Sequence, residues 1–333
     1  MPASDISMAA LATLDGQHLQ VLQDTVRHIL FTQRAEYVFA QVVDGVPTKE
    51  TKMCKNYSVE ELFRDRAEPS PEALDLVRGW RSDFQLTSLE IDDKVLRAYT
   101  DSQLGTREYK LRLIEITAVV VHTLAALLFQ HTNQPPYKCP PPRNGIVFVE
   151  EPIEVEGCSW IRRRSQETDE LIPSPHPTYL YHNHYRDYDI YPMGVADMVA
   201  YWAETHLFGG VVVFEHGESD TEFLHVWLHP DANLKVFRLS ETQIDQFVSF
   251  GLYGEPTPAV SPFLPIKAER NTFRVLGEYS LQYNIYRSRG DRKVPVLPRG
   301  WHPRGRLEDD PQMMDVLEMY RRGELKPGHT YQI

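Results

Sequence analysis

Apolar residues follow helical spacing through the first third of the chain and predict several helices there. The positions that define the first helix, which ends before Thr32, are Leu19, Leu22, Val26, Ile29 and Leu30. Ser70 and Pro71 begin a second helix, because proline is tolerated in the first turn. A longer apolar segment predicts a third helix over about residues 106–131. Together these patterns indicate a helical lobe over residues 1–134.

A proline-rich connection follows, with five prolines between Thr132 and Gly145. Beyond it the pattern changes to short strands and further helices. The predicted strands are residues 146–150, 211–216, 222–229 and 235–239, and the predicted helices are 192–208, 241–250 and 311–322. Ser240 and Gln243 form a capping box for the helix at 241–250. Residues 264–306 have little periodicity. The expected fold class is α+β, with a lobe at 145–333 whose small mixed or antiparallel sheet packs on the helical lobe, the two forming one compact unit with the site between them.

Composition narrows the classes of partner. The 333 residues carry a formal net charge of −12, which disfavours nucleic acid because phosphate binding needs a basic face. The basic runs at 162–164 and 287–293 are interpreted as solvated loops. The longest apolar stretch, 117–129, is too short to span a membrane. Three widely spaced cysteines and the absence of a signal-peptide pattern predict a cytoplasmic protein without a disulfide framework.

Acids and histidines occupy positions where a core would hold apolar side chains. Glu115 and His122 lie seven residues apart on one stripe of the long helix, and His122 is surrounded by apolar residues. A buried histidine needs a hydrogen-bond partner or a metal ion. Both interpretations stay open, the first being a core histidine bonded to a carbonyl or a carboxylate.

The helix at 192–208 leaves almost no polar face. Asp197 and Glu204 lie one heptad apart on it, with Tyr201 between them. Glu204 stands in the last turn, where the helix dipole disfavours an anion. It therefore needs a cation, and an arginine or a metal ion would serve equally well.

A hairpin at 211–229 adds further acids. A four-residue loop predicts that Glu215 faces Glu222, with Glu218 close by in the loop. Opposed carboxylates repel each other unless they share a cation or a proton. His229 ends the second strand before Pro230, at a position common for functional side chains.

Tyrosines crowd the start of the 192–208 helix and offer flat apolar rings with polar tips. They are Tyr179, Tyr181, Tyr185, Tyr188 and Tyr191. Most are expected to pack structurally, while Tyr185 and Tyr188 are candidates for catalysis as general acids. The sequence has no phosphate loop, dinucleotide fingerprint or nucleophile elbow, which removes the main support for kinase, dehydrogenase and hydrolase-elbow functions.

One run of residues resembles a group of fungal proteins. It comprises Tyr188-Asp-x-Tyr-Pro-x-Gly194, Asp197, Tyr201-Trp-Ala-Glu204, Gly209-Gly-Val, Phe214-Glu-x-Gly-Glu-Ser219, Glu222 and His229. The long helix with Glu115 and His122 also fits this group, which includes the zinc-dependent cyclopenase of quinolone alkaloid biosynthesis. The resemblance implies ring contraction of a benzodiazepinedione epoxide to a quinolone, with Zn²⁺ as a Lewis acid.

Three functions compete. The leading hypothesis is a zinc-dependent lyase of secondary metabolism that acts on a small aromatic heterocycle, with Glu204, Tyr185 and Tyr188 in catalysis. Its candidate metal ligands are His122, Glu115, Glu204, Glu215, Glu218, Glu222 and His229. The alternative is a non-catalytic protein that binds a small molecule or a partner and pairs its buried acids with arginines. A metal-dependent hydrolase with the same site is the third.

Overall fold

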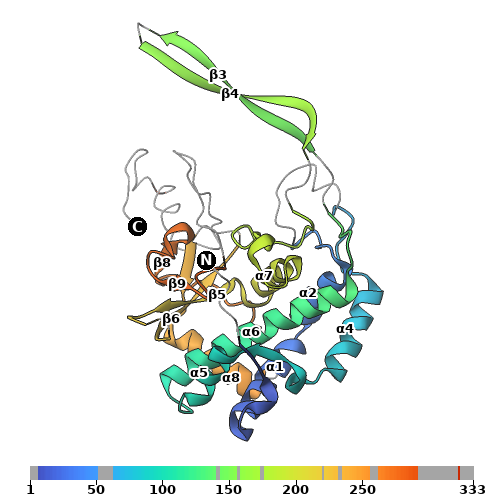
Figure 1. Ribbon diagram of the computed structural model, residues 1–333, viewed down its shortest axis with the longest axis vertical. Coiled ribbons are helices and arrows are strands. Elements are labelled where there is room, and N and C mark those ends of the chain that lie inside the picture. Colours follow the sequence, from blue (N-terminus) through green and yellow to red (C-terminus); the bar gives the residue numbers. More distant parts are fainter. Residues whose placement is uncertain are drawn as a thin grey trace.

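The computed structural model describes residues 7–51, 63–139, 143–155, 158–172, 176–219, 221–231, 235–255, 262–291 and 322. Helices dominate the first part of the chain and reappear between the strands of the second (Figure 1). The α-helices in these ranges are α1 (Gly16–Leu30), α2 (Gln33–Asp44), α4 (Pro71–Asp83), α5 (Asp93–Asp101), α6 (Arg107–Thr132), α7 (Val195–Phe208) and α8 (Glu241–Tyr253).

The main sheet is antiparallel and five-stranded, in the order β8-β7-β6-β5-β9. Its strands are β5 (Val211–His216), β6 (Phe223–His229), β7 (Lys235–Arg238), β8 (Arg274–Leu276) and β9 (Ile285–Tyr286). Two smaller antiparallel pairs join β1 (Met8–Ala10) to β2 (Glu90–Asp92), and β3 (Arg143–Val155) to β4 (Cys158–Ile172). The β3–β4 hairpin projects away from the rest of the fold (Figure 1). Helices together with a largely separate antiparallel sheet make this an α+β fold, as the sequence predicts.

Helix ends confirm the capping signals. The hydroxyls of Ser70 and Thr106 accept the backbone N–H groups of the first turns of α4 and α6. Ser240 and Gln243 form the predicted capping box at α8. Thr32, expected only as the end of the first helix, also caps α2. These caps depend on neighbouring residues alone, which is why the sequence reveals them.

Helix α6 lies at the centre of the fold and packs against α7 as well as α1, α2, α5 and α8. Sixteen of its 26 residues are buried, in line with the apolar sequence. By length and composition α6 could cross a membrane, yet 78% of its most apolar window is buried inside the protein. One hydrophobic core runs from Leu11 to Ile266 and therefore draws on both predicted lobes. A second cluster, centred on Tyr201, joins α7 to β5 and β6.

The register predicted for the β5–β6 hairpin is wrong. Glu215 pairs with His225 and not with Glu222, and Val211 pairs with His229. A bulge after Glu215 and a longer loop shift the pairing, and the loop is closed by the Gly217 N–H, which donates to the Glu222 carbonyl. Two opposed carboxylates therefore do not occur at this place.

Other differences are smaller. Helix α7 begins at Val195, three residues after the predicted start. The poorly periodic segment at 264–306 contains β8 and β9, whose two or three residues are too few to show an alternating pattern. Apart from Arg322, the helix predicted at 311–322 lies outside the described residues.

Candidate functional site

Packing of α6 against α7 brings His122 and Glu204 together. The Nδ1 atom of His122 lies 2.7 Å from Oε1 of Glu204, and its Nε2 atom lies 3.1 Å from Oδ1 of Asp197. Ionised carboxylates only accept hydrogen bonds, so both nitrogens of His122 donate and the ring is positively charged. Burial lowers the pKa of His122, but the two carboxylates outweigh burial and raise this pKa to about 9.

Arg287 supplies the cation that Glu204 needs at its unfavourable helix position. Its guanidinium donates to Oε1 at 2.8 Å and to Oε2 at 2.5 Å, and also to the carbonyl of Val212. Burial raises the pKa of Glu204, but Arg287 outweighs burial and holds this pKa below its ordinary value. We call His122, Asp197, Glu204 and Arg287 the buried ion network.

A backbone N–H group holds Asp197 in place, and a further acid, Asp291, interacts with Arg287. Oδ2 of Asp197 accepts the N–H of Met193 at 2.7 Å, which fixes the carboxylate at the start of α7. Asp291 accepts the N–H of Ser288 at 2.8 Å. Burial raises the pKa of Asp291, against the influence of Arg287. Each charge of the network thus has a partner from the protein itself.

Tyrosine rings cover the network. The ring of Tyr201 meets that of His122 edge-on at 4.5 Å between centroids, and Tyr185 stacks on Tyr201 at 4.5 Å. Tyr191 lies 5.4 Å from Tyr201. Tyr185, Tyr191 and Tyr201 are buried, whereas Tyr188, in the short 3₁₀-helix Tyr188–Ile190, is 37% exposed. The rings therefore serve as packing around the network, and Tyr188 is the accessible member.

Glu115 lies apart from His122, about two turns of α6 away. Its carboxylate pairs with Arg112 at 2.9 Å, and both side chains are buried. Burial raises the pKa of Glu115 to about 7, although Arg112 acts in the opposite direction. An arginine therefore partners this acid too.

The three hairpin acids also have separate surroundings. Glu215 accepts the indole N–H of Trp227 at 3.1 Å. Glu222 accepts the backbone N–H of Glu218 at 3.2 Å and thereby closes the loop. Glu218 is exposed. The structure does not bring these acids to His122.

His229 belongs to a second polar cluster, on the far side of Tyr185. The hydroxyl of Tyr185 lies 3.3 Å from its Nδ1, and the ring of His184 lies 4.5 Å away. The Nε2–H of His182 donates to the His229 carbonyl at 3.1 Å, while its Nδ1 accepts the N–H of His184. His182 is therefore held as the Nε2–H tautomer.

The donors around His122 do not fit a zinc ion as they are arranged. Zinc needs three or four donors about 2.0–2.3 Å from one point. The two ring nitrogens of His122 face different acids, so the acids lie on opposite sides of the ring. Arg287 already donates to both carboxylate oxygens of Glu204. Within the described ranges no group of three or more His, Cys, Asp or Glu side chains could hold a metal ion. The zinc site stays a prediction from sequence.

Sequence reasoning missed Arg287, Asp291 and the pair His182 and His184. Arg287 was interpreted as part of a solvated basic run, yet its side chain is 12% exposed. The sequence feature that points to such an arginine is Glu204, an acid on an apolar helix that needs a positively charged partner. No local pattern shows which of the chain's many arginines provides it.

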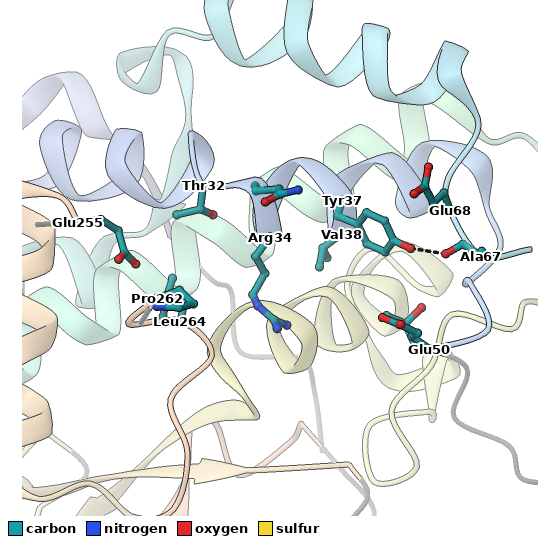
Figure 2. A pocket seen from close by; sticks show the side chains of 12 residues that line it. Thr32, Arg34, Tyr37, Val38, Glu50, Ala67, Glu68, Glu255, Pro262 and Leu264 are labelled. Carbon is teal, nitrogen blue, oxygen red and sulfur yellow. Dashed lines mark hydrogen bonds between the residues drawn. The ribbon is translucent and has the colours of Figure 1, made fainter. Parts of the chain in front are cut away.

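A large cavity lies elsewhere and shares no described residue with the buried ion network. Its volume is about 750 Å³, and it lies between the start of α2 and the segment that follows α8 (Figure 2). Its lining residues are Thr32, Gln33, Arg34, Tyr37, Val38, Glu50, Thr51, Ala67, Glu68, Glu255, Pro262 and Leu264. A second cavity of about 690 Å³ adjoins it and shares Arg34, Glu255, Pro262 and Leu264.

Comparisons with family models, with curated protein sequences and with solved structures give no match to this chain.

Proposed function

We propose that the protein is a non-catalytic binding protein for a small, compact molecule, which occupies the cavity beside α2. The observation that carries this proposal is the cavity itself. Its volume of about 750 Å³ falls in the range of about 300–1,000 Å³ typical of small-molecule sites. Of its 12 described lining residues, seven are polar or charged and five are apolar or aromatic, so the cavity offers a ligand both kinds of contact.

The buried ion network supports the same proposal from another direction. Glu204 and Glu115, which the sequence offers as metal ligands, are both paired with arginines. Arginine-paired acids are what the binding-protein hypothesis predicts. In this proposal the network fixes α6, α7 and the Arg287 segment relative to one another and takes no part in chemistry.

Isothermal titration calorimetry with a panel of compact aromatic molecules tests the proposal. The variant Ala67→Trp places an indole at the cavity wall and is expected to abolish binding. Leu76→Trp is the matched control, because Leu76 is exposed on α4 and does not line the cavity. Equal binding by both variants would place the ligand elsewhere, and no binding by any panel member would remove the proposal.

A zinc-dependent lyase of the cyclopenase type is the second candidate. The observation in its favour is that Asp197 and Glu204 each lie within hydrogen-bond distance of His122, and all three residues are of types that zinc accepts. Zinc would compete there with Arg287 and with the protons of His122. Chelator-sensitive turnover of a benzodiazepinedione epoxide to a quinolone would establish this candidate in place of the binding protein.

A further inference from the structure

We propose that the ligand of the cavity beside α2 is an organic cation, a protonated amine on a compact apolar or aromatic body. This inference rests on the proposed binding function and names the chemistry of the ligand. It follows from the charges that line the cavity, from one carboxylate oxygen without a partner among the described residues, and from the apolar surface opposite.

Charge is the first argument. Three glutamates, Glu50, Glu68 and Glu255, line the cavity together with one arginine, Arg34. Three negative charges against one positive charge give the described part of the lining a formal charge of −2. A concave surface of one sign concentrates ligands of the opposite sign. The cavity therefore favours cations over anions.

Arg34 reduces the negative charge of the lining without cancelling it, and its charge acts on Glu50. One of its terminal nitrogens donates to the carbonyl of His206 at 2.8 Å, at the end of α7. In Figure 2 the side chain extends from α2 across the cavity toward this helix end, with Glu50 on one side and Glu255 on the other. Arg34 thus links α2 to α7, and the formal charge of −2 already includes its positive charge.

Glu255 provides the most specific argument. Its Oε1 accepts the N–H of Phe263 at 2.9 Å, which fixes the carboxylate against the segment after α8. Its Oε2 is buried and has no hydrogen-bond partner among the described residues. A buried acceptor without a donor is costly and uncommon in folded proteins. An ammonium group in the cavity would offset the charge of this carboxylate, whose Oε2 is buried in the cavity wall beyond direct contact.

The apolar side of the cavity fits the body of such a ligand. Pro262 offers aliphatic surface and Tyr37 an aromatic ring, while Val38 and Leu264, each 2% exposed, are almost fully buried beside the cavity. The Tyr37 hydroxyl donates to the Ala67 carbonyl, which holds the ring in place along the wall (Figure 2). Aromatic faces attract ammonium groups, so Tyr37 suits either the cation or its apolar body.

Calorimetry with three related probes tests the inference. 2-Phenylethylamine is cationic at pH 7, 2-phenylethanol is neutral, and phenylacetate is anionic, while all three share the phenyl ring. We expect the amine to bind at least tenfold more tightly than the alcohol, and phenylacetate not to bind. Glu255→Gln is expected to weaken amine binding at least tenfold while leaving the alcohol within twofold. Glu68→Gln is expected to weaken amine binding several-fold.

Glu90→Gln is the matched control, since Glu90 is exposed on β2 and does not line the cavity. It is expected to bind the amine like the unmodified protein. Equal affinity for amine and alcohol, or equal losses in Glu255→Gln and Glu90→Gln, would overturn the amine inference and leave the binding function standing. Failure of all three probes, and of the wider aromatic panel, would remove both.

Discussion

Arg287 holds both carboxylate oxygens of Glu204, across 83 residues of sequence and inside the protein. The same carboxylate accepts the Nδ1–H of His122. An acid in the last turn of an apolar helix is thereby neutralised by two cations, one from α6 and one from beyond β9. The buried acid on α7 needs a positively charged partner, and Arg287 and His122 provide it.

Glu204→Gln should destabilise the protein by about 3–5 kcal/mol, because it leaves the buried Arg287 without its ionic partner. Urea unfolding followed by circular dichroism measures the change in the free energy of unfolding. Glu218→Gln is the control, because Glu218 is exposed in a loop and should change that free energy by less than about 0.5 kcal/mol. Similar small effects of both substitutions would contradict a stabilising role for the ion network.

Stability should fall as the pH rises from about 6.5 to about 9. The pKa of His122 is raised from its ordinary 6.5 to about 9 in the folded protein, so its contribution is complete below the unfolded pKa and is lost through the folded one. The contribution amounts to about 3 kcal/mol at 1.36 kcal/mol for each unit of pKa.

Unfolding free energies measured at several pH values, in the unmodified protein and in His122→Gln, isolate this effect. The difference between the two proteins should shrink as the pH approaches 9. NMR titration of the His122 ring gives its pKa directly. A value near or below 6.5 would contradict the doubly hydrogen-bonded ring.

If the protein is the proposed binding protein, chelation should leave the thermal unfolding temperature unchanged within about 1 °C, because Glu115 and Glu204 already have arginine partners and need no metal ion. Differential scanning fluorimetry with and without EDTA measures this. Stoichiometric zinc in elemental analysis, lost together with stability in His122→Ala, would instead favour the zinc-dependent lyase.

Gly209→Ala should destabilise the protein by about 1–3 kcal/mol. Gly209 ends α7 with a φ of 95°, and a Cβ there would lie 2.3 Å from the Ile266 carbonyl oxygen. Gly79→Ala is the matched control, since Gly79 lies inside α4 and a Cβ there meets nothing within 4 Å. The control should be stabilised by about 0.5–1 kcal/mol. Thermal unfolding of both variants compares the two glycines, and equal signs would contradict the close packing behind α7.

Local features of the fold could be predicted from the sequence. Ser70, Thr106 and Ser240 each cap a helix at the expected place, because capping depends on residues two or three positions away. The meeting of His122 with Glu204 was also foreseeable, since two buried helices with polar residues on single stripes have few ways to pack. The caps rest on short-range rules, and the meeting of His122 with Glu204 rests on the polar stripes of two otherwise apolar helices.

Three other features, each set by distant parts of the chain, could not be predicted from the sequence. The β5–β6 register depends on a bulge next to Glu215, and one inserted residue changes every later pair. The identity of Arg287 as the partner of Glu204 depends on β9, a two-residue strand with no sequence signature. The cavity beside α2 is assembled from segments before residue 70 and after residue 254, and no pattern along the chain marks their approach.

The long separation between Glu204 and Arg287 has a consequence for synthesis of the protein. A ribosome completes α6 and α7 well before it adds residue 287, and domains fold as units only once their parts are present. Until then Asp197 and Glu204, the two acids of α7 that are buried in the folded protein, can pair only with His122. The layer formed by α6 and α7 therefore closes in its final form only after β9 and Arg287 have emerged. A chain shortened to end before Arg287 keeps both helices in its sequence and loses the charge that lets them pack.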